Sequence, residues 1–352
     1  MNLKQREYVG PTTLSTSLAL LMANITFVKK HSMVLDPFVG TASILVAASF
    51  YGGVCFGADI DIRVLKGDMY AGQLRKGQQA APVVSHKRDV FGNFATYGLP
   101  RPDLIRMDNH IWDRHVHRPA AATDGMFDVI VTDPPYSIRA GARKSGKKGG
   151  CVYTVDADRR ESHLASTQSY AVEEVMLDLL HTAARCLRVG GSMSYLIPTP
   201  YDFDTALDLP VHPCLSLGRV CHQKLTTRHG RHLVVMHKAC EYTAEKEQEF
   251  RAYKQQVLAD ALALKVANAE GAGEAMDTEG ARGFSSLMSR LVRALASGAR
   301  DDDGVVVISS NKATRRYECK KLRAKIRDEH SVASCGAAWE VGQTNTNTNT
   351  NA

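Results

Sequence analysis

Residues 127–139, FDVIVTDPPYSIR, decide the fold of this chain. Phe127–Thr132 is an apolar run rich in β-branched residues, which predicts a buried strand, and it leads directly into a DPPY turn at 133–136. Two consecutive prolines fix their own φ angles and bias the residue before each toward extended backbone, so the turn is rigid. Asp133 and Tyr136 are therefore held at the carboxyl end of a strand, which is the ligand-binding edge of an open α/β sheet.

The DPPY turn offers three groups that suit one task. The Asp133 carboxylate and the Pro134 carbonyl accept hydrogen bonds, and Tyr136 presents an aromatic face. Together they can hold a planar exocyclic amine and leave its nitrogen lone pair facing an electrophile. The turn therefore predicts a site at which an amine is the nucleophile, with these three residues as its catalytic group. Taken alone, the same four letters are also compatible with an ordinary turn.

A second motif upstream has the form of a cofactor site. Met33–Ser43, MVLDPFVGTAS, is a short apolar run followed by Asp36 and then by a glycine turn that opens another apolar segment. This order predicts strand, turn and helix. Gly40 lets the backbone pass close to a ligand, and the helix N-terminus offers free N–H groups. The turn lacks the G-x-G-x-x-G pattern that a NAD site predicts.

Acidic residues close the next two predicted strands. The run VCFGADID ends in Asp59 and Asp61, and an acid about 20 residues after a glycine turn is the usual partner of ribose hydroxyls. The following run, LIRMD, ends at Asp108. Glycine turn, acid, acid and DPPY at successive strand ends predict a doubly wound α/β sheet with one site along its carboxyl edge.

The alternation of strands and helices continues to about residue 241. Tyr170–Leu187 has apolar residues at helical spacing, and the RVGG that follows at 188–191 predicts a helix stop and a turn. The last two strands predict an antiparallel hairpin that completes a seven-stranded sheet. The expected elements are a helix at Leu14–Asn24 and strands at Met33–Asp36, Val54–Asp59, Leu104–Asp108, Phe127–Thr132, Ser192–Ile197, Leu215–Leu225 and His232–Lys238.

Composition divides the chain into a domain at 1–241, a helical and basic extension at 242–330 and a disordered low-complexity tail at 331–352. A glycine-, alanine- and acid-rich linker is expected near 270–283. Within the extension we expect a solvent-exposed helix at Glu245–Ala269, an amphipathic helix at Phe284–Ala296, a short strand at VVVIS and a basic stretch at Lys312–Arg327.

The whole chain has 352 residues, a formal net charge of +7 and 44% hydrophobic residues. This is an ordinary globular composition, and the basic balance is compatible with a polyanionic substrate. No run approaches the roughly 18 apolar residues of a membrane span, and the N-terminus lacks a secretory signal. The eight cysteines form no C-x-x-C pair, which predicts reduced thiols in the cytosol or the nucleus, and a cytoplasmic location is expected. The histidines at 110, 115 and 117 lack a supporting ligand pattern, so no metal is expected.

Residues 3–238 resemble the catalytic domain of the tRNA (guanine(10)-N2)-methyltransferase family. The segments YVGPTTLSTSLALLMAN at Tyr8–Asn24 and TDPPYSIRAGARKSG at 132–146 carry the resemblance, and DPFVGTAS, GADID, YLIPTP and HPCLSL also fit it. DPPY alone is the broader amino-methyltransferase signature. The resemblance implies a class I, Rossmann-like methyltransferase fold, S-adenosylmethionine as cofactor and methyl transfer to N2 of guanosine 10 in tRNA. It also implies a small zinc-binding activator subunit as a partner.

The resemblance further implies roles for individual residues. Asp133 and the Pro134 carbonyl would accept hydrogen bonds from the guanine amine, and Tyr136 would stack on the base. Asp59 would bind the ribose hydroxyls and Asp108 the adenine amine. Other implied contacts are Asp36, Phe38, Gly40 and Thr41 with the cofactor, Gly10, Pro11 and Thr12 near its methionine end, and Ser137, Arg139, Arg143 and Lys144 with the RNA.

Three features depart from the family pattern. Ser137 stands where a glycine usually follows DPPY. Ala42 stands where the first loop usually has a second glycine, and its methyl group is tolerable unless φ is positive. Family members usually carry an N-terminal RNA-binding region with a THUMP module, whereas this chain starts at the catalytic domain. Either the sequence is truncated, or another element binds the RNA.

Two basic segments each have two interpretations. The glycine-rich loop Arg139–Gly150 reads either as a solvated loop or as a lid over the RNA backbone. Lys312–Arg327 reads either as a solvated face or as a substitute RNA-binding element.

The sequence leaves other functions open. One is an amino-methyltransferase acting on adenine N6 or on guanine N2 of a different RNA. Another is a non-catalytic RNA-binding subunit that keeps the fold, although the intact set of acids speaks against it. A glutamine methyltransferase more often has NPPY, so Asp133 argues against that substrate. The sequence does not say which tRNAs are used or whether one methyl group or two are added.

Overall fold

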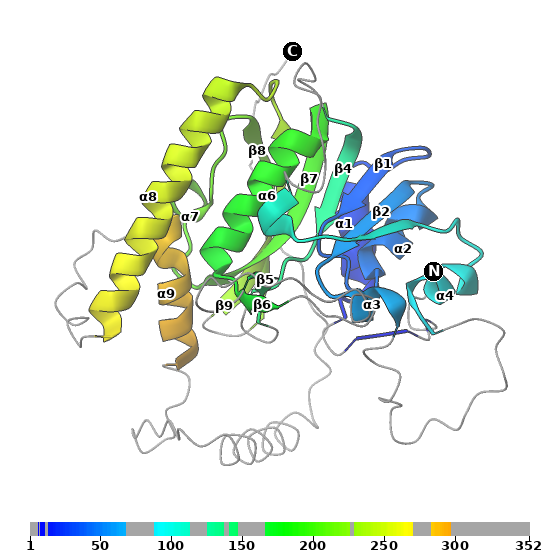
Figure 1. The fold of residues 1–352 in the computed structure, drawn as a ribbon, viewed down its shortest axis with the longest axis horizontal. Coiled ribbons are helices and arrows are strands. Elements are labelled where there is room, and N and C mark those ends of the chain that lie inside the picture. The colour runs from blue at the N-terminus through cyan, green and yellow to red at the C-terminus, as the bar shows by residue number, and fades with distance from the viewer. Residues whose placement is uncertain are drawn as a thin grey trace, which may run out of the picture.

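The computed structural model describes residues 6, 8–10, 13–67, 88–112, 125–136, 141–146, 166–225, 229–269 and 283–296. Their centre is a seven-stranded sheet in the order β3-β2-β1-β4-β7-β9-β8 (Figure 1). The first five strands in this order pair in parallel, and β9 pairs antiparallel with β7 and β8. The strands are β1 Met33–Asp36, β2 Val54–Asp59, β3 Asp103–Arg106, β4 Phe127–Thr132, β7 Leu187–Pro200, β8 Leu215–Lys224 and β9 His229–Lys238.

This is the predicted class I methyltransferase sheet with its C-terminal hairpin, and the prediction is confirmed. The chain runs from β1 outward through β2 to β3, and then crosses to β4 on the other side of β1. The order of strands therefore reverses between β1 and β4. In open α/β sheets, ligands bind outside the carboxyl ends of the strands at such a reversal.

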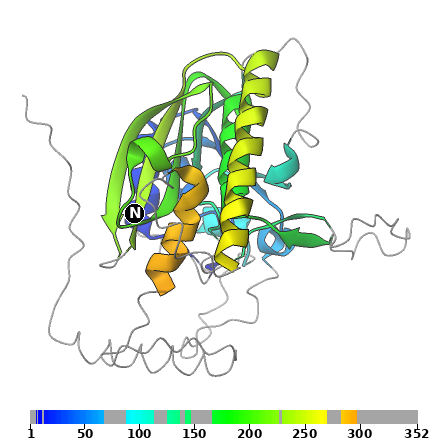
Figure 2. The same cartoon turned by 90° about the vertical axis from the view of Figure 1, so that its left-hand side faces the viewer.

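Helices cover both faces of the sheet, as the two views in Figures 1 and 2 show. α1 to α4 contribute buried side chains to the core on one face, and α6, α8 and α9 contribute to the core on the other. The helices are α1 Thr16–Ile25, α2 Ser43–Phe50, α3 Ile62–Lys66, α4 Val90–Thr96, α6 Val172–Cys186, α7 Thr205–Asp208, α8 Ala244–Ala269 and α9 Phe284–Ala296, with a 3₁₀ turn, η2, at Asn109–Ile111. A two-stranded hairpin, β5 Arg143–Ser145 and β6 Thr167–Ser169, lies apart from the main sheet.

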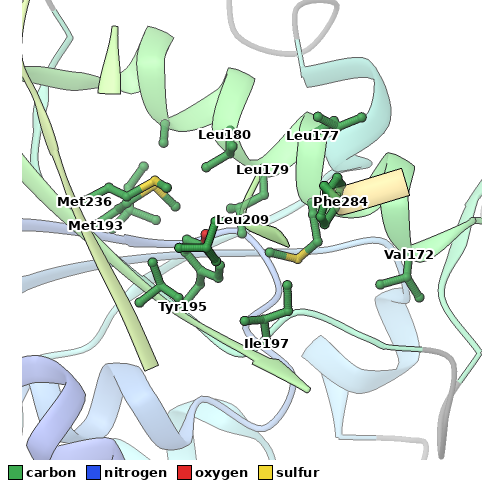
Figure 3. Packing of buried hydrophobic residues seen from close by; sticks show 14 of the residues in the cluster. Val172, Leu177, Leu179, Leu180, Met193, Tyr195, Ile197, Leu209, Met236 and Phe284 are labelled. Carbon is green, nitrogen blue, oxygen red and sulfur yellow. The ribbon is translucent and has the colours of Figure 1, made fainter. Parts of the chain in front are cut away.

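The core between α6 and the sheet is tightly packed (Figure 3). Leu177, Leu180 and Tyr195 are fully buried there. Phe284 of α9 belongs to the same cluster, and so does Phe250 of α8. Burying one large apolar side chain contributes about 1.5–3 kcal/mol, so the two C-terminal helices are energetically part of this layer.

Two expectations about the elements are wrong. The helix stop predicted at 188–191 is not a turn after α6: strand β7 begins at Leu187, directly after the helix. Phe127 of β4 pairs with Leu187 of β7, and Val129 pairs with Ser192. β7 therefore uses more residues than β4 between these two pairs, and the glycines lie in this irregularity of the strand. The glycine pair is accommodated there because Gly190 has φ +80°, which glycine adopts readily.

The second correction concerns α8, which was expected to be solvent-exposed. Phe250, Val257 and Ala261 are at most 7% exposed, whereas Leu262 is 63% exposed. One stripe of the helix therefore packs on the domain, and the opposite side faces solvent. None of the helices in the described ranges combines the length and apolar character that a membrane crossing requires.

Candidate active site

Four acidic residues gather at the carboxyl edge of the sheet. Asp36 ends β1, Asp59 ends β2, Asp108 follows β3 and Asp133 follows β4. Neighbouring parallel strands end at the same edge, so these side chains, widely separated in sequence, surround the reversal between β1 and β4. This is the arrangement that the sequence predicts.

Asp36 joins the two central strands at that reversal. Its Oδ1 accepts hydrogen bonds from Thr132 Oγ1 at 2.6 Å and from the Phe38 N–H at 3.1 Å. The residue is 1% exposed, and burial raises the pKa of its carboxyl group to about 7. Asp36 therefore connects β1 to β4 and holds the start of the glycine turn. It has this structural role even without a ligand. Thr132 was not among the predicted site residues, because nothing local in the sequence indicates this cross-strand partner.

Asp59 ties the glycine turn to β2. Its Oδ2 accepts a hydrogen bond from the Gly40 N–H at 3.0 Å, and its Oδ1 accepts one from the Asp61 N–H at 2.9 Å. Burial raises the pKa of Asp59 to about 6, against the lowering effect of these hydrogen bonds. Near neutral pH this carboxylate is an acceptor poised beside the turn, as a ribose-binding acid has to be.

The glycine turn has two residues with positive φ, and one of them is Ala42, whose φ the sequence could not predict. Gly40 has φ +51°, and Ala42 has φ +62°, so the methyl group of Ala42 occupies a left-handed conformation. The Asn93 amide donates hydrogen bonds to the carbonyl oxygens of Thr41 at 3.2 Å and Tyr8 at 2.7 Å. Asn93 thus links the turn to the N-terminal segment, a role that could be found only once α4 is placed in space.

Asp108 is held by two backbone N–H groups from different segments. Its Oδ1 accepts a hydrogen bond from His110 at 2.9 Å, and its Oδ2 accepts one from Ser145 at 2.6 Å. Ser145 belongs to the small hairpin that follows the DPPY turn, so this hairpin returns to the end of β3. The carboxylate is 4% exposed and keeps lone pairs for a further donor, such as an amine.

The DPPY turn forms its own hydrogen-bond pair. The Tyr136 hydroxyl lies 2.9 Å from Asp133 Oδ1 and also contacts the carbonyl oxygen of Leu196 on β7. Burial raises the pKa of Asp133, and it raises the pKa of Tyr136 well above its ordinary value, so the tyrosine stays a neutral donor. Pro134 is buried between these two residues in the same turn.

Arg231 of β9 is a charged neighbour of this pair that the sequence did not indicate. It lowers the pKa of Asp133 against the effect of burial, because a cation stabilises the carboxylate. The Arg231 Nε donates a hydrogen bond to Gln223 Oε1 at 2.5 Å, and Gln223 is its register partner on β8. The C-terminal hairpin therefore contributes a cation to the edge of the sheet that carries the DPPY turn.

The predicted RNA-contacting residues are placed unevenly. Arg143 is exposed and donates hydrogen bonds to Thr167 across the small hairpin. Lys144 is engaged within the domain, with its Nζ 2.6 Å from Glu174 Oε1. Phe38 packs against the cluster that contains Ala142 and Tyr170, the residues that flank this hairpin. The predictions for Pro11, Thr12, Ser137 and Arg139, together with the basic stretch and most of the basic loop, lie outside the described residues.

The arrangement fits an adenosyl cofactor. A buried acid beside the glycine turn, at Asp59, can accept two hydroxyl hydrogen bonds, and Asp108 one strand away can accept an amine. The DPPY turn lies on the neighbouring strand across the reversal. A site of this shape can place a cofactor between β1 and β4 and an amine nucleophile at Asp133.

Models of known protein families give no match to this chain. Among characterised proteins, it is 41% identical over 245 residues to the tRNA (guanine(10)-N(2))-methyltransferase TRMT11 of Dictyostelium discoideum, which covers 68% of this chain and 43% of that protein. The human TRMT11 is 33% identical over 239 residues, covering 67% and 50%. The solved structure of TrmN from Thermus thermophilus matches with a TM-score of 0.40 at 17% identity, over 64% of this chain and 49% of that one.

The chain spans about half the length of the curated relatives it matches. The matched length, roughly two thirds of this chain, is that of the domain in which the glycine turn, the strand-end acids and the DPPY turn lie. The matched part of the chain belongs to the family of tRNA (guanine(10)-N(2))-methyltransferases.

Proposed function

We propose that this chain transfers a methyl group from S-adenosylmethionine to the exocyclic N2 amine of guanosine 10 in tRNA. The observation that supports this most strongly is the DPPY turn, rigid and half-buried at the end of β4, on a domain homologous to tRNA (guanine(10)-N(2))-methyltransferases. Asp59 accepts hydrogen bonds from the ribose hydroxyls, and Asp108 accepts one from the adenine amine. The other proposed cofactor contacts are Phe38, Gly40, Thr41 and Thr12. Asp36 holds the start of the glycine turn in place through its hydrogen bonds to Phe38 and Thr132.

The acceptor amine is positioned rather than strongly activated. The N2 lone pair of guanine is delocalised into the ring, so the amine is a poor nucleophile. Hydrogen bonds from this amine to Asp133 Oδ2 and to the Pro134 carbonyl pull the nitrogen toward tetrahedral geometry and free the lone pair. Among the described residues, Asp133 Oδ1 is already held by Tyr136, which leaves Oδ2 for the substrate. Positioning of this kind is a large part of catalysis in group transfer.

The cofactor supplies an electrophilic methyl group on a sulfonium. The nitrogen lone pair would form the new N–C bond as the S–C bond breaks. The electron pair of the broken S–C bond would stay on sulfur. The proton then leaves N2, and Asp133 is the acceptor within reach. Tyr136 contacts the base, which has to leave its stack to enter the pocket. The proposed RNA contacts are Ser137, Arg139, Arg143 and Lys144. Of the two that the structure describes, Arg143 is exposed and Lys144 is partly buried.

The proposal includes the partners and the compartment that the family resemblance of the sequence implies. RNA binding by the whole protein, a small zinc-binding activator subunit and a cytoplasmic location follow from the resemblance of the motifs. Support for tRNA as the substrate comes from the names of the homologous enzymes.

The test is methyl transfer from labelled S-adenosylmethionine to unmodified tRNA, with and without the activator subunit. The matched control is the same tRNA with adenosine in place of guanosine 10. We expect N2-methylguanosine at position ten by nucleoside mass spectrometry and no label in the control RNA. Label at adenine N6, or at guanosines elsewhere, would replace this proposal with a different amino-methyltransferase.

A further inference from the structure

A buried polar cluster connects the C-terminal helix α8 to the turn that follows β3. Its centre is Asp178 on α6, whose side chain is 6% exposed. Asp178 Oδ2 lies 2.8 Å from His110 Nδ1, and Asp178 Oδ1 pairs with Lys254 Nζ of α8. Tyr170 donates its hydroxyl to Asp178 Oδ2. Helix α8 lies alongside α6 in both views, so this contact belongs to an extended helix pair (Figures 1 and 2).

The same cluster reaches Asp108 by two routes. His110, whose ring contacts Asp178, donates its backbone N–H to Asp108 Oδ1 at 2.9 Å. Ser145 donates its N–H to Asp108 Oδ2 at 2.6 Å, and its neighbour Lys144 pairs with Glu174 at 2.6 Å. Each oxygen of Asp108 is therefore oriented by a segment that an acid of α6 holds in place. Coupling of this kind passes through direct contacts between rigid elements.

A metal site is a weaker interpretation of these residues. Single ligand atoms of His110, Glu174 and Asp178 lie within 4.8 Å of one another. Both carboxylates, however, already have an ammonium partner, Lys144 for Glu174 and Lys254 for Asp178. Burial acts to raise the pKa of Asp178, but the contacts with His110 and Lys254 outweigh it and hold that pKa below its ordinary value. The positive charge that the acids need is thus supplied by the protein itself.

We infer that helix α8 is part of the cofactor site, with Lys254 as a positioning residue that holds Asp178, His110 and through them the Asp108 carboxylate in line for the adenine amine. This inference rests on the proposed function, because it takes Asp108 as the adenine acceptor. It gives α8 a role beyond covering the core. Lys254 lies outside every motif that the sequence analysis identified, yet it would influence whether the site prefers an adenine or a hypoxanthine base.

The experiment compares two lysines on the same helix. Lys254→Met removes the partner of Asp178, and Lys265→Met removes the partner of Glu173, another buried acid of α6, which it contacts at 3.2 Å. Both changes delete one positive charge beside a buried acid of α6, but Glu173 does not touch the Asp108 turn in the described residues. Calorimetry on the full chain gives the dissociation constants of S-adenosylhomocysteine and of S-inosylhomocysteine, in which a carbonyl oxygen replaces the adenine amine.

We expect wild type and Lys265→Met to prefer the adenosyl ligand equally. Lys254→Met should lose about tenfold of that preference, within the usual range of coupling between sites, and Lys254→Arg should restore most of it. Glu174→Gln removes the ion pair with Lys144, which holds the Ser145 segment against Asp108, and it should lower the preference as well. This variant replaces Lys254→Met in the test if that protein does not fold. An unchanged preference in both Lys254→Met and Glu174→Gln would overturn the inference. Failure of the wild type to bind either ligand would instead refute the proposed function.

Discussion

Single residues at the carboxyl edge of the sheet combine a structural and a chemical task. Asp36 and Asp59 differ in how far their oxygens are used within the protein: the Oδ1 of Asp36 links two strands and a turn, whereas Asp59 uses each oxygen once. Asp36 therefore keeps its Oδ2 for a ligand, whereas Asp59 is held by hydrogen bonds at both oxygens. The same division holds in the DPPY turn, where one oxygen of Asp133 is taken by Tyr136.

The left-handed Ala42 gives a prediction in which three effects nearly cancel. Ala42→Gly should relieve about 1–2 kcal/mol of backbone strain. It loses about 0.8 kcal/mol of methyl burial, because Ala42 is fully buried, and about 0.5–1 kcal/mol to the flexibility of glycine. The free energy of unfolding should change by less than about 1 kcal/mol.

Gly40→Ala is the control for that prediction. A Cβ at Gly40 meets nothing within 4 Å, so the strain at φ +51°, about 1–2 kcal/mol, is offset only by the roughly 0.5–1 kcal/mol gained when the flexibility of glycine is removed, and the variant should lose at most about 1.5 kcal/mol. Denaturant unfolding measures both variants. A large gain in Ala42→Gly would show that the turn stores more strain than this balance allows.

Arg231 gives a prediction for pH dependence. Burial raises the pKa of Asp133, and Arg231 lowers it, so removing the cation should raise that pKa further. Because the proposed mechanism needs the carboxylate, the acidic limb of the rate profile should move to higher pH in Arg231→Gln. At mildly acidic pH the variant should therefore be slower relative to wild type than at alkaline pH. Exposed Arg219, on the neighbouring β8, provides the control substitution to Gln. Equal shifts in the two variants would contradict this role.

Among the secondary-structure elements, the two C-terminal helices lie where the sequence predicted them, but α8 packs on the domain where a solvent-exposed helix was expected. Their buried residues join the core that α6 forms with β7 and β9. Two leucine substitutions separate this packing from helix propensity. Leu287 of α9 is fully buried, and Leu262 of α8 is 63% exposed.

Leu287→Ala should lower the free energy of unfolding by about 2–5 kcal/mol. Leu262→Ala should change it by less than about 0.5 kcal/mol, as surface substitutions usually do. Chemical denaturation of the full chain provides both values. Similar small losses in the two variants would mean that α9 does not pack on the domain as described.

The elements also show what sequence alone can and cannot provide. The bounds of β1, β2 and β4 were predicted because each is an apolar run that ends at a strand-closing residue. The full extent of β7 was missed because Gly190 and its neighbour were interpreted as a turn, and only the pairing of Leu187 and Ser192, on either side of them, with β4 shows that the strand continues through this stretch. The buried stripe of α8 was missed because its charged and alanine residues hide a sparse apolar spacing.

For the whole molecule, the sheet reversal between β1 and β4 brings the two motifs together. The proposed cofactor residues follow the first three strands, the proposed acceptor turn follows the fourth, and the C-terminal hairpin adds a cation. The sequence predicted the first two groups because their motifs are local. It could not predict Asn93, Arg231 or Lys254, because each acts through a partner at least 50 residues away or on another strand.

The most direct test of the central claim is methyl transfer by Asp133→Asn, measured beside its affinity for S-adenosylhomocysteine. Asparagine keeps the size of the side chain but removes the carboxylate that holds and deprotonates the amine. We predict that transfer to guanosine 10 of tRNA falls by at least about 100-fold, while calorimetry shows cofactor affinity within about threefold of wild type. Transfer at the wild-type rate in this variant would contradict the assignment of the DPPY turn as the catalytic site.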